Sequence, residues 1–584
     1  MVDGSLQENT ENRNNITSRF QISDSFADRL SCSTTDGAAR KQALEVLARK
    51  TWNSTAVVPY RSSGRLLIID QVHADVDQQR AIALAKDLVA DGFNCTVLIG
   101  GLEPDSRDQV CRKLSTQNIT VVAGRLADLA GFMGQFTALL EGKRVDTDLA
   151  QLGPAAGDYF DLVLDLNIPP FLQREVLPPG YYAPAEDREY LRAALEEIPH
   201  MTGEFGKPVY VKYQANICTH GSKGITGCTR CLDVCPADAI GEKGEKIEVN
   251  TSLCQGCGSC IMNCPTGALS YTWPPVHEWL IMMRDILATY RNAGGSSPDL
   301  LLYDDKATGA LQAHIDTLPD NLIPVPVEEI GSTGMDAWLS VLAYGAGSIT
   351  LLVGDGTPRS ILTGLRSQFS VAHAMLEGMG YAKERLCLVE AGGEKAFLTG
   401  NSGTRPRQEN PAAGFNPFEK HRTIRLALDH LYKYAPAPRE SASLPDGATF
   451  GEIQVDHDSC TLCMSCVAIC PVQALQHDAS QLQLGFVELN CVQCGLCRNA
   501  CPEDSITLLP RYVYDDVLAG KPRVLNEDEP FCCITCGKPF ISRRMYEAIT
   551  EKLAATGNWK VKKDVVPEWL QMCGHCRTTY TRQG

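Results

Sequence analysis

The stretch Cys460-Thr-Leu-Cys463-Met-Ser-Cys466-Val-Ala-Ile-Cys470-Pro471 decides the fold of the segment around it. Its spacing recurs in Cys491-Val-Gln-Cys494-Gly-Leu-Cys497-Arg-Asn-Ala-Cys501-Pro502. In bacterial two-cluster ferredoxins, the first three cysteines of such a run bind one [4Fe-4S] cluster and the fourth binds the other. Numbered along the chain, the expected sites here are site 3 (Cys460, Cys463, Cys466, Cys501) and site 4 (Cys491, Cys494, Cys497, Cys470).

An earlier segment contains one complete run, Cys254-x2-Cys257-x2-Cys260-x3-Cys264-Pro265, and one irregular run, Cys228-x2-Cys231-x3-Cys235-Pro236. Ile225 stands where the first cysteine of the irregular run belongs. We expect Cys218 to replace it across an insertion from Thr219 to Gly227, because an alternating strand pattern precedes Cys218 as it precedes each complete run. The expected ligands are those of site 1 (Cys218, Cys228, Cys231, Cys264) and site 2 (Cys254, Cys257, Cys260, Cys235).

Two alternatives concern the irregular run. If Cys218 is a free thiol, site 1 holds a three-iron cluster. His220, inside the insertion, is an ordinary loop histidine, a hydrogen-bond donor to sulfur or a nonstandard ligand. With all sixteen cysteines bound, no iron is left open, and this favours outer-sphere electron transfer over chemistry on a substrate.

The C-terminal segment carries two further C-x2-C pairs, Cys533 with Cys536 and Cys573 with Cys576. Two such knuckles are typical of a structural zinc site, and four thiolates also suit a single iron, as in a rubredoxin. We expect one Zn, or one Fe, at these four residues. Cys532 and His575 lie beside the knuckles and are possible replacement ligands.

Alternating strand and helix patterns surround the cysteine-rich segments and predict two α/β domains. Strands are expected at 66–69, 95–99, 119–122 and 160–165 in the first, and at 300–303, 323–327, 349–353 and 386–389 in the second. Helices are expected at 77–89, 105–114, 279–290 and 423–432. The expected fold class is α/β plus small α+β: two α/β domains interleaved with two bacterial-type 2[4Fe-4S] ferredoxin modules and a zinc-ribbon-like C-terminal segment.

Composition shifts along the chain predict its division into parts. These are a flexible N-terminal arm at 1–55 with a helix near 38–50, an α/β domain at 56–205, a ferredoxin module at 206–275, a second α/β domain at 276–434, a Pro/Ser-rich linker at 435–450, a second ferredoxin module at 451–515 and the C-terminal segment at 516–584.

Nucleotide-binding and catalytic motifs are missing from both α/β stretches: the sequence has no Gly-x-Gly-x-x-Gly fingerprint after the first strands, no Walker A motif and no catalytic triad. Gly354-Asp-Gly356 follows a strand and precedes a helix, so its N–H groups either bind an anion or form a turn and cap. Asp70, Asp304 and Asp305 at strand ends are interpreted as helix caps. We therefore expect scaffolds or docking surfaces, and no catalytic residue is assigned.

Composition favours a soluble cytoplasmic protein. The 25 cysteines occur largely as C-x2-C pairs, a pattern of metal binding. A formal charge of −16, from 54 basic and 70 acidic residues, argues against nucleic acid and suits docking on a basic patch of a redox partner, or solubility alone. Residues 1–15 lack the apolar segment of a signal peptide, and the uncharged stretch 337–354 contains glycines that favour a buried helix, turn and strand over a membrane span.

Segments outside the repeated runs carry a family resemblance: Phe160-Asp-Leu-Val-Leu-Asp-Leu166, Pro178-Pro-Gly-Tyr181, Ile217-Cys-Thr-His220, Gly227-Cys-Thr-Arg-Cys231 and Glu328–Gly347. Over residues 60–510 the chain resembles the large cytoplasmic ferredoxin-type proteins encoded beside bacterial molybdenum- or tungsten-containing formate dehydrogenases. It lacks the N-terminal cysteine motif of some of them. The resemblance implies electron transfer to or from a partner oxidoreductase, with formate dehydrogenase the candidate.

Three functions follow from these features. The first is an iron–sulfur protein with four [4Fe-4S] clusters that relays electrons to or from a partner and is no enzyme on its own. The second is an accessory, assembly or redox-sensing protein for a molybdo-enzyme, with the C-terminal knuckles as an interaction module. The third is an oxidoreductase that binds a flavin in an α/β domain. We expect the first.

Overall fold

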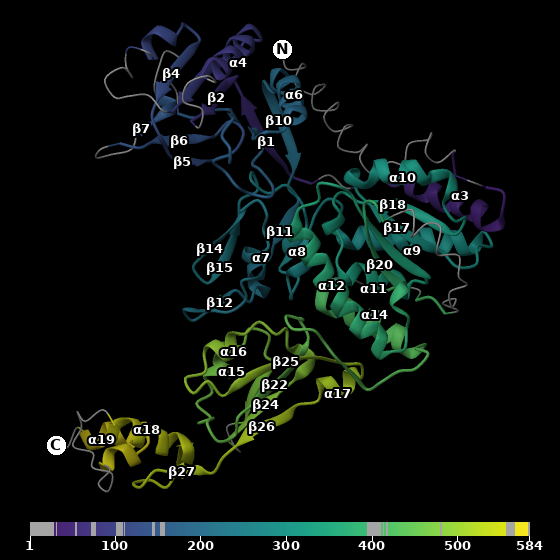
Figure 1. The fold of residues 1–584 in the computed structure, drawn as a ribbon. Helices are drawn as coiled ribbons and strands as arrows, with labels where there is room; N and C mark the ends of the chain where they lie inside the picture. The colour runs from purple at the N-terminus through teal and green to yellow at the C-terminus, as the bar shows by residue number, and fades with distance from the viewer. Residues whose placement is uncertain are drawn as a thin grey trace, which may run out of the picture.

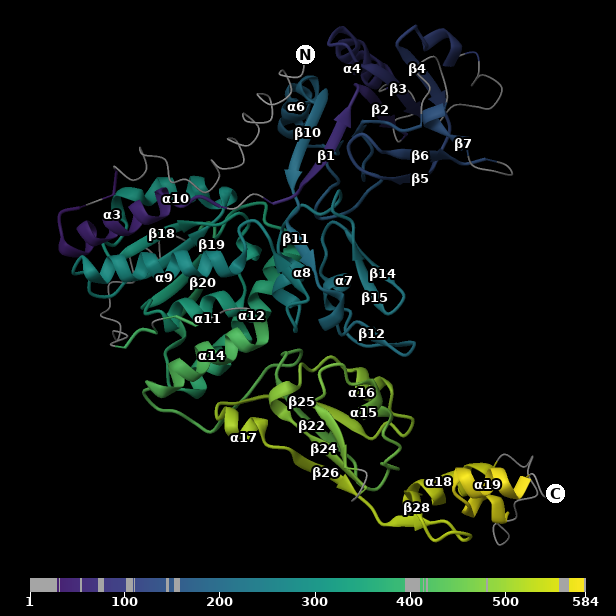
Figure 2. The ribbon, with the colours of Figure 1, turned by 180° about the vertical axis from the view of Figure 1, so that it is seen from behind.

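The computed structural model describes residues 29–30, 32–52, 55–71, 78–100, 109, 111–142, 147–151, 158–393, 410–412, 414–415, 419–478, 482–555 and 567–581. Figures 1 and 2 show two larger parts, each with a β-sheet and its helices, two smaller parts that contain the cysteine runs, and a C-terminal segment at one end of the molecule. No helix in these ranges is long and apolar enough to cross a membrane.

The first α/β domain is built on a parallel sheet in the order β4-β3-β2-β8-β9. Its strands are β2 (Arg65–Asp70), β3 (Asn94–Ile99), β4 (Ile119–Ala123), β8 (Leu162–Asp165) and β9 (Tyr181–Tyr182). Strand β2 is apolar on both faces, as expected for a central parallel strand. Leu66 and Ile68 pack in the core that includes Ala81 and Ala85 of helix α4 (Gln78–Ala90).

The other face of this sheet is covered by a small antiparallel sheet. Its strands are β5 (Leu126–Ala130), β6 (Thr137–Leu140) and β7 (Thr147–Asp148). Leu67 and Ile69 of β2 pack in this second core with Phe136. Helix α6 (Arg188–Glu197) follows, and a ribbon of β1 (Val57–Ser62) with β10 (Gly203–Pro208) leads to the first module. Most of the helix expected at 105–114 lies outside the described residues.

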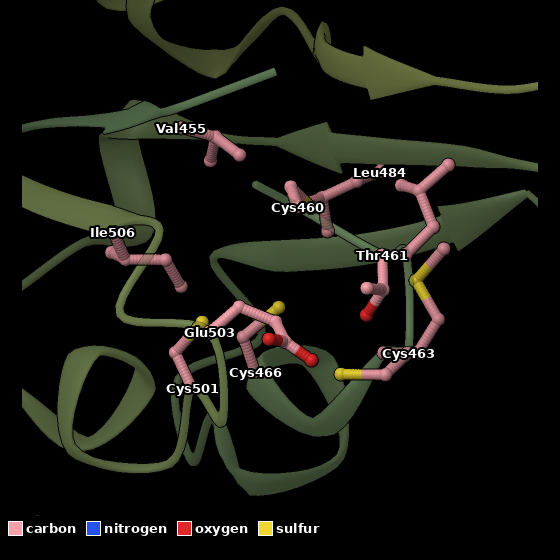
Figure 3. Close-up of a pocket in the computed structure, with 11 residues that line it drawn as sticks. Val455, Cys460, Thr461, Cys463, Cys466, Leu484, Cys501, Glu503 and Ile506 are labelled. Carbon is pink, nitrogen blue, oxygen red and sulfur yellow. The ribbon is translucent and has the colours of Figure 1, made fainter. Parts of the chain in front are cut away.

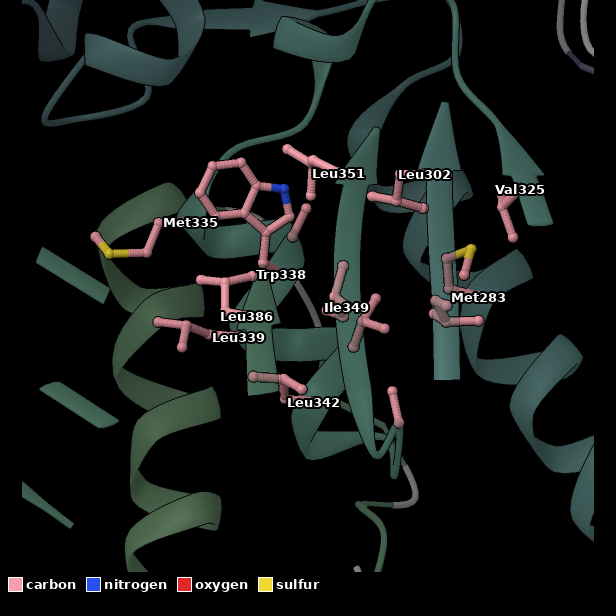
Figure 4. Packing of buried hydrophobic residues seen from close by; sticks show 14 of the residues in the cluster. Met283, Leu302, Val325, Met335, Trp338, Leu339, Leu342, Ile349, Leu351 and Leu386 are labelled. Atoms are coloured by element: carbon pink, nitrogen blue, oxygen red, sulfur yellow. The ribbon is translucent and has the colours of Figure 1, made fainter. Parts of the chain in front are cut away.

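The second α/β domain has a parallel sheet in the order β18-β17-β19-β20. Its elements are β17 (Asp299–Tyr303), β18 (Leu322–Pro326), β19 (Ser348–Val353) and β20 (Leu386–Glu390), with helices α9 (Val276–Asn292), α10 (Thr308–His314), α11 (Met335–Ala343), α12 (Arg359–Gly378) and α14 (Lys420–Lys433). Figure 4 shows Trp338, Leu339 and Leu342 of α11 beside Ile349 and Leu351 of β19. All are essentially buried.

The helix expected in the N-terminal arm is present as α3 (Thr35–Ala48), but it packs firmly against the second α/β domain. Its buried Leu44 and Leu47 belong to the core of that domain. Asp36 accepts hydrogen bonds from the Tyr290 hydroxyl at 2.7 Å and from the Ser296 N–H at 2.8 Å. This docking contradicts a flexible arm at residues 35–48, because the small and aliphatic face of α3 is buried against α9.

The two cysteine-rich modules share one topology, in which the first strand pairs with the last and a hairpin lies between them. Module 1 contains β11 (Val211–Tyr213), α7 (Arg230–Asp233), β14 (Ile240–Lys243), β15 (Lys246–Val249), α8 (Ser259–Asn263) and β16 (Leu269–Tyr271). Module 2 contains β22 (Gly451–Val455), α15 (Ser465–Ile469), β23 (Leu475–Asp478), β24 (Gln483–Phe486), α16 (Leu496–Asn499) and β25 (Ile506–Val513).

The expected linker at 435–450 forms part of the folded structure. It contains β21 (Ser441–Ser443), which pairs with β25. Ala442, Leu444 and Ala448 are buried in the core of the second α/β domain. Apolar residues among the prolines and serines therefore attach module 2 to that domain.

The C-terminal segment begins with α17 (Asp516–Gly520) and β26 (Arg523–Glu527), which extends the sheet of module 2 by pairing with β24. A hairpin of β27 (Pro530–Cys532) and β28 (Pro539–Ser542) follows, then α18 (Arg543–Ala555) and α19 (Gly574–Thr581). In Figure 1 these last elements form the yellow end of the chain, beyond module 2.

Candidate metal centres

The four cysteines of site 3 line one cavity of about 360 Å³. Figure 3 shows their side chains around this space, with the Glu503 side chain among them. The remaining walls are largely apolar, with Val455, Leu484 and Ile506. Cys501 comes from the far end of the second run and lines this cavity with the first three cysteines of the first run.

Site 4 has the same construction. Its four cysteines line a cavity of about 320 Å³ together with Val472, Val492, Leu496 and Leu508. Burial, and then the nearby thiolates of Cys494 and Cys470, raise the pKa of the Cys491 thiol to about 12. Since an apolar wall does not solvate a thiolate, anionic sulfur at this place requires a cation beside it.

Site 1 brings Cys218 together with Cys228, Cys231 and Cys264, all four of which line a third cavity of about 320 Å³. Cys218 ends a 3-10 turn with φ −74° and ψ 130°. Cys491, the first cysteine of a complete run, ends a matching turn with φ −73° and ψ 126°. Cys218 therefore holds the position of a first cysteine in a run.

The insertion between Cys218 and Cys228 is a β-hairpin of β12 (Gly221–Ser222) and β13 (Ile225–Thr226). Its base is closed by hydrogen bonds from the Gly227 N–H to the His220 carbonyl at 2.7 Å and from the Cys228 N–H to the Thr219 carbonyl at 3.2 Å. His220 is buried, and its Nδ1 lies 3.0 Å from the Cys228 carbonyl. The ring thus braces the hairpin base.

Site 2 gathers four thiols whose charges interact. Burial, and then the charges of Cys235 and Cys254, raise the pKa of Cys257 to about 12. The same two thiols, with Cys257, raise the pKa of the fully enclosed Cys260. The Ala239 N–H also donates to the sulfur of Cys235 at 3.2 Å.

Backbone conformation explains how each complete run points three thiols at one point. The residues before and after the middle cysteine adopt left-handed φ values, and this winds the loop tightly. These residues are Leu462 and Met464, Gln493 and Gly495, and Gly256 and Gly258. Buried thiols, apolar walls and N–H donors to sulfur are together the environment that suits a [4Fe-4S] cluster.

The C-terminal cysteines also converge. One ligand atom from each of Cys533, Cys536, Cys573 and Cys576 lies within 4.8 Å of the others. The Cys536 and Cys573 sulfurs are 3.8 Å apart. Four thiols at this spacing fit a tetrahedral metal ion. Cys532 and His575 are exposed and stand outside this group.

The loop Gly354-Asp-Gly356 is a turn whose helix end is already capped. Glu175, from the first α/β domain, accepts from the Ser360 N–H at 2.9 Å and from the Ser360 hydroxyl at 2.6 Å. A carboxylate of the chain itself thus occupies the start of α12, where an anion would bind. Asp304 accepts from the backbone N–H groups of Lys306 and Ile330, as expected of a cap.

Two features of these sites lie beyond what sequence reasoning identified. Glu503 lines site 3, and the hairpin after Cys218 contacts module 2. The acidic residue two positions after Cys501 was a visible signal for the first. No local pattern signals the second, because it depends on the packing of two separate modules.

Comparison with known families agrees with the cysteine geometry. Residues 225–272 match the LdpA Fe-S cluster-binding domain, and residues 459–506 match a 4Fe-4S dicluster domain. The first match begins after Cys218, so it covers three of the four cysteines of site 1.

Curated relatives are similar over short segments. The chain is 50% identical to hydrogenase-4 component A of Escherichia coli K12 over 40 residues, which are 7% of this chain and 20% of the relative. It is 34% identical over 59 residues to a ferredoxin of Rickettsia felis, covering 10% of this chain and 54% of the relative. It is 38% identical over 84 residues to an uncharacterized ferredoxin of Methanocaldococcus jannaschii, covering 14% of this chain and 43% of the relative.

The chain thus spans roughly a fifth to a half of the length of these relatives. Both family matches fall on the cysteine runs. The chain is thus similar to iron–sulfur proteins of the ferredoxin type, with one segment that matches an Fe-S cluster-binding domain and one that matches a 4Fe-4S dicluster domain.

Proposed function

We propose that this protein holds four [4Fe-4S] clusters and relays electrons, in the cytoplasm, to or from a partner oxidoreductase. The observation that carries the proposal is that three cavities are each lined by four cysteines, and each set is drawn from two separate runs. The ligand sets are those of sites 1 to 4. We further propose one Zn, or one Fe, at the C-terminal cysteines. The proposed domains are the α/β domains at 56–205 and 276–434, the ferredoxin modules at 206–275 and 451–515, and the C-terminal segment at 516–584.

A cluster of this type gains or loses one electron when bound. The side chains around each site exclude water, and N–H groups such as those of Ala239 and Ser505 donate to ligand sulfurs, the latter to Cys501 at 3.4 Å. Such donors stabilise the added negative charge of reduction. With every cysteine of a set assigned to the cluster, each iron would already have its protein ligand, and this favours outer-sphere electron transfer.

The partner is proposed from two separate likenesses. One relative is a hydrogenase component, which supports a redox enzyme as partner. The resemblance over residues 60–510 points to formate dehydrogenase. The formal charge of −16 suits docking on a basic surface of such an enzyme.

Metal analysis of protein purified without oxygen tests the proposal. Four clusters of four irons require about sixteen irons and sixteen sulfides per chain, with one zinc (or a further iron) and no flavin. Reduction gives EPR signals of spin-coupled [4Fe-4S]⁺ pairs. Formate with formate dehydrogenase should reduce the clusters. Several zincs with little iron would overturn the electron-transfer function, whereas a bound flavin would instead indicate an enzyme.

A further inference from the structure

The two modules touch through the hairpin that interrupts site 1. The Asn499 side-chain amide of α16 donates to the Thr226 carbonyl of β13 at 2.9 Å. Arg230 of module 1 donates to the Gly447 carbonyl, just before module 2, at 2.6 Å. Figures 1 and 2 both show β12 facing α16 across this junction.

The closest approach is between Gly227 and Leu496. A Cβ added at Gly227 would lie 2.4 Å from the Leu496 Cγ, so any larger residue would require Leu496 to move. Leu496 is fully buried at this junction. The contact depends on glycine because the side chain of Leu496 fills the space that a side chain at 227 would need.

This contact joins two metal sites. Gly227 immediately precedes Cys228 of site 1, and Leu496 lies between Cys494 and Cys497 and lines the cavity of site 4. One leucine side chain therefore lies at the boundary between the sites.

Neighbouring sites within each module are also linked. In module 1, Cys264 of site 1 and Cys260 of site 2 are buried in one hydrophobic cluster. In module 2, Cys466 of site 3 and Cys497 of site 4 are buried in one cluster. The four sites are thus arranged in the spatial order 2, 1, 4, 3.

We propose that the hairpin at residues 219–227 is a docking element that joins the two modules into one electron path through sites 2, 1, 4 and 3. The inference rests on the proposed function. Each step moves one electron from a reduced cluster to an oxidised neighbour, with no bond formed or broken. A one-electron donor at one end of the path supplies the electron, and a one-electron acceptor at the other end takes it up. The buried Leu496 keeps water out of the junction.

The experiment compares the full-length wild type with Gly227→Val, Asn499→Ala and the control Gly241→Val. Gly241 lies on β14 with no atom within 4 Å of an added Cβ. Iron and sulfide are counted first. Less than one electron per chain is then injected by photoreduction, and its redistribution is followed by freeze-quench EPR at several protein concentrations. The EPR spectrum of the fully reduced protein gives the spin coupling.

In the wild type and Gly241→Val, we expect redistribution at a rate independent of protein concentration and magnetic coupling beyond that of two separate pairs. Gly227→Val should keep its iron and the coupling within each pair but lose the extra coupling and the concentration-independent phase. Asn499→Ala changes no residue that directly neighbours a ligand cysteine. It should also weaken the extra magnetic coupling and slow the concentration-independent phase.

The path is overturned if wild-type protein with all four clusters shows two independent pairs. It is also overturned if Gly227→Val, fully loaded, keeps the wild-type coupling and rate. If Gly227→Val loses iron, the test rests on Asn499→Ala. The path is then overturned if Asn499→Ala keeps the wild-type coupling and rate. An iron content far below sixteen in the wild type would instead remove the proposed function itself.

Discussion

The ammonium group of Lys552 lies 2.7 Å and 2.9 Å from the two carboxylate oxygens of Glu503, which lines the site 3 cavity. Lys552 belongs to α18, in the C-terminal segment. The Ser542 hydroxyl of the same segment donates to the Thr461 carbonyl, in the loop of site 3, at 2.7 Å. The C-terminal segment therefore places a positive charge beside Glu503, whose side chain Figure 3 shows among the cysteines of site 3.

This charge pair predicts opposite shifts in the reduction potential of one cluster. A cluster gains negative charge on reduction, so Glu503→Gln should raise the potential and Lys552→Met should lower it. Because Lys552 is largely solvent-exposed, we expect shifts of the reduction potential on the order of tens of millivolts. For a one-electron couple, a shift of about 59 mV corresponds to a tenfold change in the equilibrium constant. Redox titration followed by EPR measures both, and Lys538→Met, an exposed lysine outside the cavity, is the control. Shifts of the same sign in both variants would contradict the charge argument.

Replacement of Cys218 by serine tests the irregular run. Because Cys218 lines the same cavity as the other three cysteines of site 1, its loss should leave one iron labile. We expect about fifteen irons per chain and an oxidised three-iron EPR signal, with the other clusters unchanged. Cys387→Ser, on β20 outside the four sites, should retain the full iron content. A Cys218→Ser protein with no loss of iron and no three-iron signal would remove Cys218 from the ligands.

The C-terminal site should lose its metal when one of its converging thiols is removed. Cys573→Ser takes away a sulfur that lies 3.8 Å from that of Cys536. Three remaining ligands bind a structural metal weakly, so elemental analysis should show the loss of one zinc, or one iron, per chain. The exposed Cys532 stands outside the group, so Cys532→Ser should retain the metal. Equal metal content in the two variants would contradict the assignment.

Acid should weaken the attachment of module 2 to the second α/β domain through His421. Its ring stacks on Phe450, with centroids 4.3 Å apart. Burial, and then the nearby Arg425, lower the pKa of His421 to about 3. In the unfolded chain a histidine takes up its proton near pH 6.5. The stabilisation is therefore complete above pH 6.5 and falls as the pH drops toward 3, by up to about 1.4 kcal/mol per unit.

Thermal unfolding between pH 7.5 and pH 5 measures this effect. The melting temperature of the wild type should fall more steeply with acid than that of His421→Phe, which keeps an aromatic ring but has no titrating group. His477→Phe, at an exposed position on β23, should follow the wild type. Identical pH profiles for the wild type and His421→Phe would contradict the role of this ring.

The sequence by itself determined the features that depend on local spacing. The cysteine runs specify tight loops, and they predict an exchange of Cys470 and Cys501 between sites. Apolar runs such as Leu66 to Ile69 located the central strands, because a buried parallel strand needs apolar residues on both faces. The spacing also predicted an insertion from Thr219 to Gly227, but not the β-hairpin that this insertion forms.

Only the tertiary structure decided which distant surfaces meet. The face of α3 that carries Leu44 could pack on any apolar surface, and the fold places it on the second α/β domain. The contact of Gly227 with Leu496 and the ion pair of Lys552 with Glu503 join residues 269 and 49 positions apart. Periodicity and spacing report the conformation of neighbouring residues, whereas such contacts depend on the complementary shape and charge of surfaces that exist only after each part has folded.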